Sequence, residues 1–395
     1  MAVDVALKVN GRRYSGWKSV RVTRSIESLA GSFDLEVSDR WGDADEPWPI
    51  MEEDECEVQI GGETVIVGDI ATRGGSGDAN SRSLRYTGKD RAARLVKNSL
   101  LVAGANVTTK ADKTDIDPTK HGAANAKWTY TNIDVLEFCR TIALQHGISV
   151  SVQPGLTLSK ATKLVVSPGE KCFDAIRRVA EAAEVLVVSD GAGGIRITRT
   201  GTARAAQLTE GVNILRYDYE YSAEERYRHY LISTQVPGTD QASGAATNVE
   251  AQATDDDVRL ASDVLIVRPD KGYSKADAQR RADWEARHRA AIAAKIFITV
   301  QGWRQPNQAL WPVNALTRVK APRLIGVDGD LLISQVEYSY GASGQGGQGG
   351  QVARLSLVRP DAFAPEPQAR VSGQGAWLIG TAGGGFAEPA GTGGR

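Results

Sequence analysis

Alternation of apolar and polar residues over short runs dominates the segment 3–86 and returns late in the chain. In one such run, Phe33, Leu35 and Val37 occupy every second position. A period of two predicts half-buried β-strands, because successive side chains of a strand point to opposite faces of the sheet. The pair Gly61-Gly62 separates two such runs and predicts a tight hairpin turn. The opening segment is therefore expected to form an antiparallel barrel or sandwich.

The connection between the first two strands of this pattern, residues 24–32, is long and charged. A hairpin between neighbouring strands needs as few as two residues, so this connection has length to spare. We expect it to reach beyond its own sheet and to contact a neighbouring β-unit or an adjacent ring of subunits. The candidate interface residues that it carries are Arg24, Ile26, Glu27 and Leu29.

The rest of the chain divides into blocks of different pattern. Apolar stripes with helical spacing predict helices within 132–147 and 167–184, with Asn132 and Ser167 as N-caps, and a third helix is expected over 273–295. The fold class is therefore α+β and mainly β, with two antiparallel barrel-like domains, an inserted small α+β domain and an inserted helix-bearing excursion. The expected bounds are 1–104 for the first barrel, 105–205 for the α+β domain, 206–235 with 296–360 for the second barrel, 236–295 for the excursion, and 361–395 for a Gly/Pro-rich tail that cannot fold alone.

Two segments hint at an internal duplication. Residues 21–38 and 216–233 are equally long, and each has the order strand, charged connection, strand. Only their end residues match in identity, so the pattern is a hint of a repeated unit and no more.

Neither the composition nor the motifs of the chain indicate an enzyme. The formal net charge of −1 creates no global field that would draw the chain to nucleic acid or anionic lipid, and no apolar run is long enough to cross a membrane. No glycine motif for a phosphate or for a nucleophilic serine occurs, and the histidines have no metal-ligand spacing. We therefore expect no catalytic residue, no cofactor and no bound metal.

Cysteines and carboxylates offer weaker alternatives. Cys139 and His146 lie on one expected helix and could act as a thiol and its base, but Cys139 falls in the apolar stripe, which favours a core residue. Cys172 lies in the stripe of the next helix and is interpreted in the same way. The acidic runs 112–117 and 255–257 could bind a hard cation, although solvated loops are the commoner case.

Two charged surfaces are candidate docking sites. The acidic segment 39–57 carries Trp41 and Trp48, and aromatic rings among like charges suit protein docking. The helix expected within 273–295 has a basic excess that includes Arg280 and Arg281, which could meet an acidic partner or a phosphate backbone. For each segment a solvated surface is the alternative.

Several motifs resemble those of a known family. The run "VNGRRYSGWKSVRVTRSIESLAGSFDLEVS", the later pieces "GDIATR" and "YTGKDRAARLVKNS", and then "SKADAQRRADWEARHR", "ITVQGWRQPNQALWPVN", "LISQVEYSY" and "RLSLVRPDAF" closely resemble the Mu-like phage tail protein P, a baseplate hub protein of contractile-tailed phages. The resemblance extends in order over about residues 5–363 and leaves out the Gly-rich tail.

The resemblance implies a structural role. Family members form homotrimers, in which two similar barrels per chain make a pseudo-sixfold ring that adapts the hexameric tail tube to the trimeric central spike. The implied partners are the tail tube protein, the central spike protein and the baseplate wedge proteins. The implied location is the tail baseplate of a virion made in the cytoplasm of a bacterial host, with DNA passing through the lumen without specific binding and with no membrane insertion.

Three other functions are alternatives to this one. An equivalent hub of a phage-derived contractile injection particle cannot be separated from a phage hub by sequence. A cell-wall hydrolase associated with a hub would need a carboxylate pair in a cleft. A nucleic-acid-binding module is disfavoured, because the resemblance implies a hub whose lumen passes DNA without binding it tightly.

Overall fold

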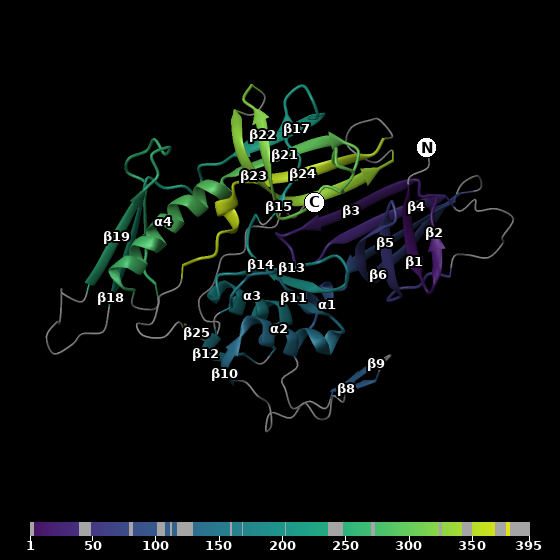
Figure 1. Cartoon of the computed structure of the whole chain (residues 1–395), viewed down its shortest axis with the longest axis horizontal. Helices are drawn as coiled ribbons and strands as arrows, with labels where there is room; N and C mark the ends of the chain where they lie inside the picture. Colours follow the sequence, from purple (N-terminus) through teal and green to yellow (C-terminus); the bar gives the residue numbers. More distant parts are fainter. Residues whose placement is uncertain are drawn as a thin grey trace.

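The computed structural model describes residues 4–38, 49–78, 82–100, 107–110, 113–116, 129–158, 160–167, 169–201, 203–235, 248–269, 273–323, 326–341, 350–367 and 377–379. Within these ranges the protein is mainly β, with few helices, as predicted. Figure 1 shows two β-rich regions side by side, a smaller helix-containing region below them, and a long helix with its own strands at one end.

The first β unit is an antiparallel sheet with the strand order β3-β4-β7-β6-β5-β1-β2. The turn between β5 and β6 is the predicted tight hairpin, and Gly61 and Gly62 both have positive φ, of 58° and 82°. Glycine is favoured at such positions because it has no Cβ. The strands are β1 (Val5–Val9), β2 (Arg12–Tyr14), β3 (Ser19–Ser25), β4 (Ser32–Ser38), β5 (Glu55–Ile60), β6 (Glu63–Gly77) and β7 (Arg82–Asp90).

The second β unit repeats the central strand order of the first. Its order β17-β21-β24-β23-β22 corresponds, strand for strand, to β3-β4-β7-β6-β5, and every pair in both series is antiparallel. Short strands β15 and β16 pair with β22 in parallel, whereas β1 pairs with β5 antiparallel. The strands are β15 (Ala203–Arg204), β16 (Leu208–Thr209), β17 (Arg216–Tyr221), β21 (Ala294–Gln301), β22 (Ala315–Ala321), β23 (Val327–Tyr340) and β24 (Val352–Val358).

The two β units form one 14-stranded sheet, because β23 of the second pairs with β3 of the first. Their inward-facing residues also belong to one buried cluster, which contains Val22 and Phe33 of the first unit together with Ile298 and Tyr338 of the second. Apolar burial is the main stabilising term in such a core. The sequence predicted two barrel-like units, and the structure adds that they share a sheet and a core.

The α+β unit packs two helices and short sheets around a second buried cluster. Asn132, the expected cap of the first helix, lies in a strand, and the Asp134 side chain caps the helix by accepting the backbone N–H of Glu137. The elements of this unit are β8 (Val107–Lys110), β9 (Lys113–Ile116), β10 (Thr129–Asp134), α2 (Val135–Ala143), η3 (Leu144–His146), β11 (Val150–Val152), β12 (Lys160–Val165), α3 (Cys172–Ala182), β13 (Leu186–Ser189) and β14 (Ile195–Thr198). The short helix α1 (Ala93–Lys97) at the end of the first unit and β25 (Trp377–Ile379) from the tail pack or pair with it.

The start of α3 differs from the sequence-based expectation. Ser167 was expected to cap this helix, but the helix begins at Cys172, and Lys171 occupies the N-cap position. The Glu170 carboxylate accepts the backbone N–H of Ser167 and pairs with Arg178 at 2.8 Å. The Glu170 carboxylate therefore makes the expected hydrogen bond to the Ser167 N–H, but this bond stabilises the loop before α3 and not the first turn of the helix.

The insertion between β17 and β21 forms a unit of its own at one end of the molecule (Figure 1). A three-stranded sheet of β18 (His229–Gln235), β19 (Asn248–Thr254) and β20 (Val264–Val267) packs against α4 (Lys275–Ile292). The side chain of Ser274 accepts the N–H of Asp277 at the predicted start of α4. Within 216–233, β17 and β18 therefore belong to different sheets, and the partner of β17 is β21.

Part of the expected unstructured tail is ordered. The 3₁₀ helix η5 (Pro360–Phe363) and the residues after it lie along α4, where the Trp284 indole donates to the carbonyl of Ala364 at 2.8 Å. β25 pairs in parallel with β12. The tail was expected to be disordered or ordered only by a partner, and for these residues α4 and β12 of the same chain supply the hydrogen-bond partners.

Candidate assembly interface

The predicted interface connection after β3 lies where three parts of the chain meet. The backbone N–H of Ile26 donates to the carbonyl of Ser334 in β23 at 2.9 Å, which extends the pairing of β3 with the second unit. Leu29 is buried in the cluster of the α+β unit. Glu27 and Ser28 are exposed at the tip. The connection thus fastens the first β unit to its neighbours within the chain, and contact of its tip with another subunit stays a prediction.

Arg24 contributes to the same junction. Its guanidinium lies 3.5 Å from the carbonyl oxygen of Ser189 in β13, at the limit of a hydrogen bond. Next to it, the Asp90 carboxylate is buried and accepts the Ser189 hydroxyl at 2.6 Å and the Ala92 N–H at 2.9 Å. Burial raises the pKa of Asp90 above its ordinary value, although these hydrogen bonds act in the opposite direction.

The two predicted arginines of α4 are engaged within the chain. Arg281 is 9% exposed, donates to Glu285 at 2.7 Å, and forms an ion pair with Glu366. Arg280 forms an ion pair with Asp277 in the first turn. Arg289 also pairs with Glu285, at 3.0 Å. The basic excess of this helix is therefore partly neutralised by its own chain, and any docking role of Arg280 and Arg281 stays a prediction.

Trp41 and Trp48, the predicted anchors of the acidic segment, lie outside the described residues. The described end of that segment packs against the first β unit: Ile50 is fully buried in its core, and Asp54 accepts the N–H of Met51 at 2.8 Å.

The junction between the two β units is an antiparallel ladder of β3 with the far half of β23. Val22 lies opposite Tyr338 and Val20 lies opposite Tyr340. Val22 and Tyr338 are 0% and 2% exposed. On the other face of the sheet, Arg21 lies 3.7 Å from Glu337 in an ion pair across the junction. A small β-branched residue on β3 and a large aromatic residue on β23 thus fill the core side of this junction.

The cysteines lack the environment of a nucleophile. Burial raises the pKa of Cys139 to about 12, which keeps its thiol protonated at neutral pH. His146 does not face Cys139; its Nε2 lies 3.5 Å from the sulfur of Cys172, whose pKa is raised by burial to about 11. The pKa of His146 is lowered, chiefly by burial, so the imidazole is not a cation that would stabilise a thiolate.

The described acidic residues do not gather into a cation site. Asp255 is buried in a forked ion pair with Arg226, with distances of 2.7 and 2.9 Å, which gives the run 255–257 a structural role. Of the run 112–117, only 113–116 is described, in β9. Among the described residues, no group of three or more His, Cys, Asp or Glu could hold a metal ion, and no helix is both long and apolar enough to cross a membrane.

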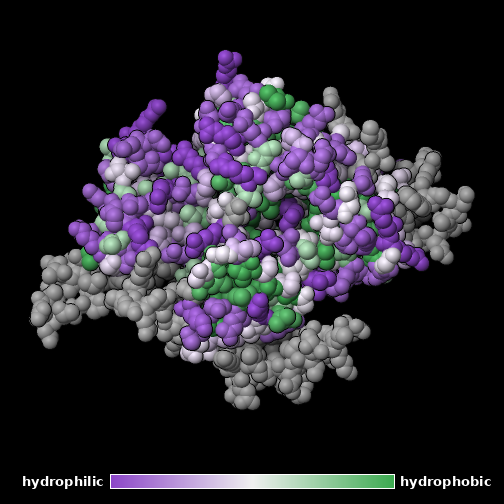
Figure 2. Space-filling view, viewed as in Figure 1, coloured by the Kyte–Doolittle hydropathy of each residue, from purple (hydrophilic) through white to green (hydrophobic). Residues whose placement is uncertain are grey.

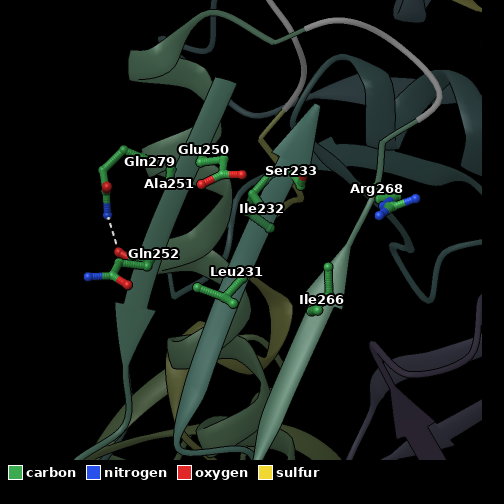
Figure 3. Close-up of a pocket in the computed structure, with 9 residues that line it drawn as sticks. All are labelled: Leu231, Ile232, Ser233, Glu250, Ala251, Gln252, Ile266, Arg268 and Gln279. Atoms are coloured by element: carbon green, nitrogen blue, oxygen red, sulfur yellow. Dashed lines mark hydrogen bonds between the residues drawn. The ribbon is translucent and has the colours of Figure 1, made fainter. Parts of the chain in front are cut away.

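A shallow cavity of about 470 Å³ lies on the sheet of the insertion. In Figure 3, Gln279 of α4 donates to the carbonyl oxygen of Gln252 at one side, while Leu231 and Ile266 stand on neighbouring strands. The figure shows no convergence of acidic and basic groups of the kind that catalysis needs. The lining residues are Leu231, Ile232, Ser233, Glu250, Ala251, Gln252, Ile266, Arg268 and Gln279.

Models of three protein domains match this chain. Residues 4–90 match the N-terminal domain of Mu phage baseplate assembly protein GpP-like, 122–199 match the second domain of baseplate hub protein gp44-like, and 274–366 match the fourth domain of Mu phage baseplate assembly protein GpP. The baseplate hub protein gp44 of Escherichia phage Mu is 26% identical over 351 residues, which are 85% of this chain and 84% of that protein. The chain belongs to the Mu-like baseplate hub family.

Solved structures agree with this family assignment. The 43 kDa tail protein of prophage MuSo2 from Shewanella oneidensis is 26% identical, with a TM-score of 0.74 over 91% of this hub chain and 99% of that chain. The tail protein of Neisseria meningitidis MC58 shares the fold, with a TM-score of 0.71 at 17% identity over 93% and 99% of the two chains. The resemblance inferred from the sequence motifs is therefore confirmed.

The most informative feature of the hub chain escaped sequence reasoning. The repeated strand order pairs β17 with β21, across the whole insertion 222–293. The sequence signal that could have found it is the spacing of alternating residues: Phe33, Leu35 and Val37 of β4 correspond to Ile296, Ile298 and Val300 of β21.

Proposed function

We propose that this chain is the structural hub of a contractile tail baseplate and that it acts as a homotrimer between the hexameric tail tube and the trimeric central spike. The observation that carries this proposal is the repeated strand order of the two β units within one chain. Three chains with two similar units each present six similar surfaces on one side. The same assembly keeps only threefold symmetry elsewhere, because the α+β unit and the insertion occur once per chain.

The rest of the chain fits a scaffolding role. The two β units share one sheet and one core, so a subunit would present both as one rigid block. Figure 2 shows a largely hydrophilic face over the β units and the insertion, with hydrophobic residues gathered over the α+β unit. The partners that this function requires are the tail tube protein, the spike and the baseplate wedge, and its location is the tail baseplate of the virion.

We also propose bounds for the parts of the chain. The first barrel-like unit spans 1–104, the α+β unit 105–205, and the tail 361–395. We assign β18 to the inserted unit, because it pairs with β19 and β20. The insertion then spans 222–293, and 206–221 with 294–360 form the second barrel-like unit.

The mass of the purified chain in solution tests this function. Size-exclusion chromatography with light scattering, alone and with the cognate spike protein, should give a trimer. A monomer that does not trimerise at high concentration, even with the spike present, would contradict the proposal. Electron microscopy of the trimer should show a ring with sixfold features at one end and threefold features at the other.

Other functions make different predictions. A hub of a phage-derived injection particle would give the same trimer, and the particle from which the chain is purified would distinguish the two. A cell-wall hydrolase would clear a peptidoglycan suspension, and a nucleic-acid-binding module would bind DNA tightly with strong salt dependence. We expect neither activity from the purified chain.

A further inference from the structure

Among the open strand edges in the described part of the chain are those of β17 and of the far half of β6. β17, at the end of the 14-stranded sheet, pairs with β21 on one side and with no described strand on the other. β6 pairs with β7 over its whole far half, but β5 covers its other side only as far as Asp69. Open edges present unpaired backbone groups that favour the addition of another strand.

In both units, a residue with positive φ turns the chain away from the long strand, β6 or β23, and leaves the far half of that strand uncovered on one side. Glu53 and Asn314 are non-glycine residues with positive φ, of 69° and 57°, just before β5 and β22. Each donates its N–H to a carbonyl oxygen of the long strand, that of Ile70 in β6 or of Ile333 in β23, at 2.9 Å. In both units the chain turns away here, so the far half of β6 or β23 is left for another partner. In β23 that partner is β3.

The repeated order gives β17 the position that β3 has in the first unit. The pairing of Val20 with Leu35 corresponds to that of Tyr217 with Ile298, and Val22 with Phe33 corresponds to Tyr219 with Ile296. Bulges at equivalent places, after Ile70 and after Ile333, align β6 with β23. Gly75 and Gly77 of β6 then correspond to Tyr338 and Tyr340 of β23.

The side chains at the two open edges are complementary in size. Within the chain, the large residues Tyr338 and Tyr340 lie opposite the small residues Val22 and Val20. At the open edges the sizes are exchanged, because β17 carries Tyr217 and Tyr219, whereas β6 carries glycines. An aromatic residue opposite a glycine is a favourable cross-strand pair, since the ring covers the exposed glycine backbone.

The exposure of the tyrosines of β17 also indicates that another strand covers this edge. Tyr217, Tyr219 and Tyr221 are 36%, 50% and 54% exposed, although their cross-strand neighbours in β21 include the buried Ile296 and Ile298. Three aromatic side chains on the core face of an edge strand are left half covered by their own chain. A strand beside β17 would extend that face and cover them.

We propose that β17 of one copy of this chain pairs antiparallel with the far half of β6 of the next copy, with Tyr219 opposite Gly75 and Tyr217 opposite Gly77. This register copies the β3–β23 junction, so one geometry joins β units within and between chains. Such a head-to-tail contact uses two different surfaces and closes into a ring. The inference rests on the proposed trimer and specifies its interface.

A cysteine pair tests the register directly. In the full chain carrying Tyr219→Cys and Gly75→Cys, mild oxidation should give covalent dimers and trimers on a non-reducing gel, because opposed Cβ atoms lie about 4.5–5.5 Å apart. The matched control carries Tyr219→Cys and Ser76→Cys, since residue 76 points to the other face of the sheet. The native cysteines are buried and should not contribute. Equal cross-linking in both proteins, or none in either, would overturn the register.

A size exchange tests the complementarity. Gly75→Tyr should raise the dissociation constant of the trimer by about 100-fold, because two tyrosines then compete for one space. The free subunit has room at this position, where an added Cβ would meet Leu84 at 3.4 Å and the Ser83 carbonyl at 3.5 Å. Adding Tyr219→Val recreates the Val–Tyr pair of the inner junction and should restore the trimer.

The outcomes separate this inference from the proposed function. If the unchanged chain forms trimers, but the cysteine pair gives no cross-link and Gly75→Tyr does not weaken the trimer, the β17–β6 interface is wrong and the trimeric hub stands. If the unchanged chain stays monomeric with the spike present, the hub proposal fails and the interface fails with it. Unchanged circular dichroism of each variant shows that its subunits are folded.

Discussion

The first and second β units have the same strand order but differ in how their first two strands are connected. In the first unit residues 26–31 join β3 to β4, whereas in the second unit residues 222–293 join β17 to β21. The units also differ in the surroundings of equivalent residues: Val22 is fully buried and Tyr219 is half exposed. The same strand order therefore accommodates connections of very different length, because each connection begins and ends at strand termini. Whether an edge residue is buried depends on the presence of a neighbouring strand.

A charge at equivalent positions should separate the two edges most strongly. Val22→Asp places a carboxylate in the shared core opposite Tyr338 and should lower the free energy of unfolding by about 4 kcal/mol. Tyr219→Asp, at the equivalent place on β17, should change subunit stability by less than about 1 kcal/mol and abolish trimers. Urea unfolding of each variant measures the difference. Equal destabilisation would mean that β17 is not an open edge in solution.

The short connection of the first unit should be fixed by one apolar anchor. Leu29→Ala removes a side chain that is 3% exposed in the core of the α+β unit and should cost about 3 kcal/mol. The matched control is Ser28→Ala, one residue away at an exposed position, which should cost little. A small loss for Leu29→Ala in thermal or urea unfolding would show that the α+β unit does not depend on this connection.

The long connection of the second unit should depend on charges instead. Glu285→Ala removes the carboxylate shared by Arg281 and Arg289, and should lower stability by about 2 kcal/mol because a buried guanidinium loses one partner. Asp283→Ala, at an exposed position of α4, is the control. Hydrogen exchange should show faster opening of α4 and the η5 segment in the first variant alone.

Asp90 should give the smallest effect, and one that depends on pH. Because burial raises its folded pKa above the unfolded value, the folded state binds more protons, so stability falls as pH rises between the two values. Asp90→Asn should remove this dependence, so its stability relative to the natural chain should rise as pH increases above about 4, the ordinary pKa of an Asp carboxyl. Unfolding measured across this range checks the sign, and a relative loss of stability with rising pH would contradict it.

Local patterns predicted many of the elements well. The alternation around Phe33, the Gly61-Gly62 turn and the Ser274 cap each depend on residues near one another in the chain, and each is present in the structure. Asn132 was wrong as a helix cap because Asp134 accepts the Glu137 N–H instead, and Ser167 was wrong because α3 begins only at Cys172, with Lys171 at its N-cap position. Neighbouring candidates of similar propensity are hard to separate by sequence alone.

For the predicted interface residues, the sequence did not identify the contact partners. The length and charge of the connection predicted that it would reach beyond its own sheet, and the structure places Ile26 against β23 and Leu29 in the α+β unit of the same chain. Arg281 was expected on a charged surface, yet it is buried and forms ion pairs with Glu285 and Glu366. A charge count along a helix does not reveal partners that arrive from a distant segment.

The sequence by itself determined that this chain is mainly β, that it carries a helical unit and a helical insertion, and that its motifs are those of a baseplate hub. The strand and helix content follows from local periodicity and turn chemistry, which act over a few residues, whereas the hub assignment follows from the resemblance of the quoted motifs to a known family. Only the tertiary structure decided that β17 pairs with β21 across the insertion, that β3 joins β23, and that β17 and the far half of β6 each have a side with no strand partner among the described residues. Strand pairing is a long-range choice made by backbone hydrogen bonds and a shared core, and those interactions carry no local signature in the sequence.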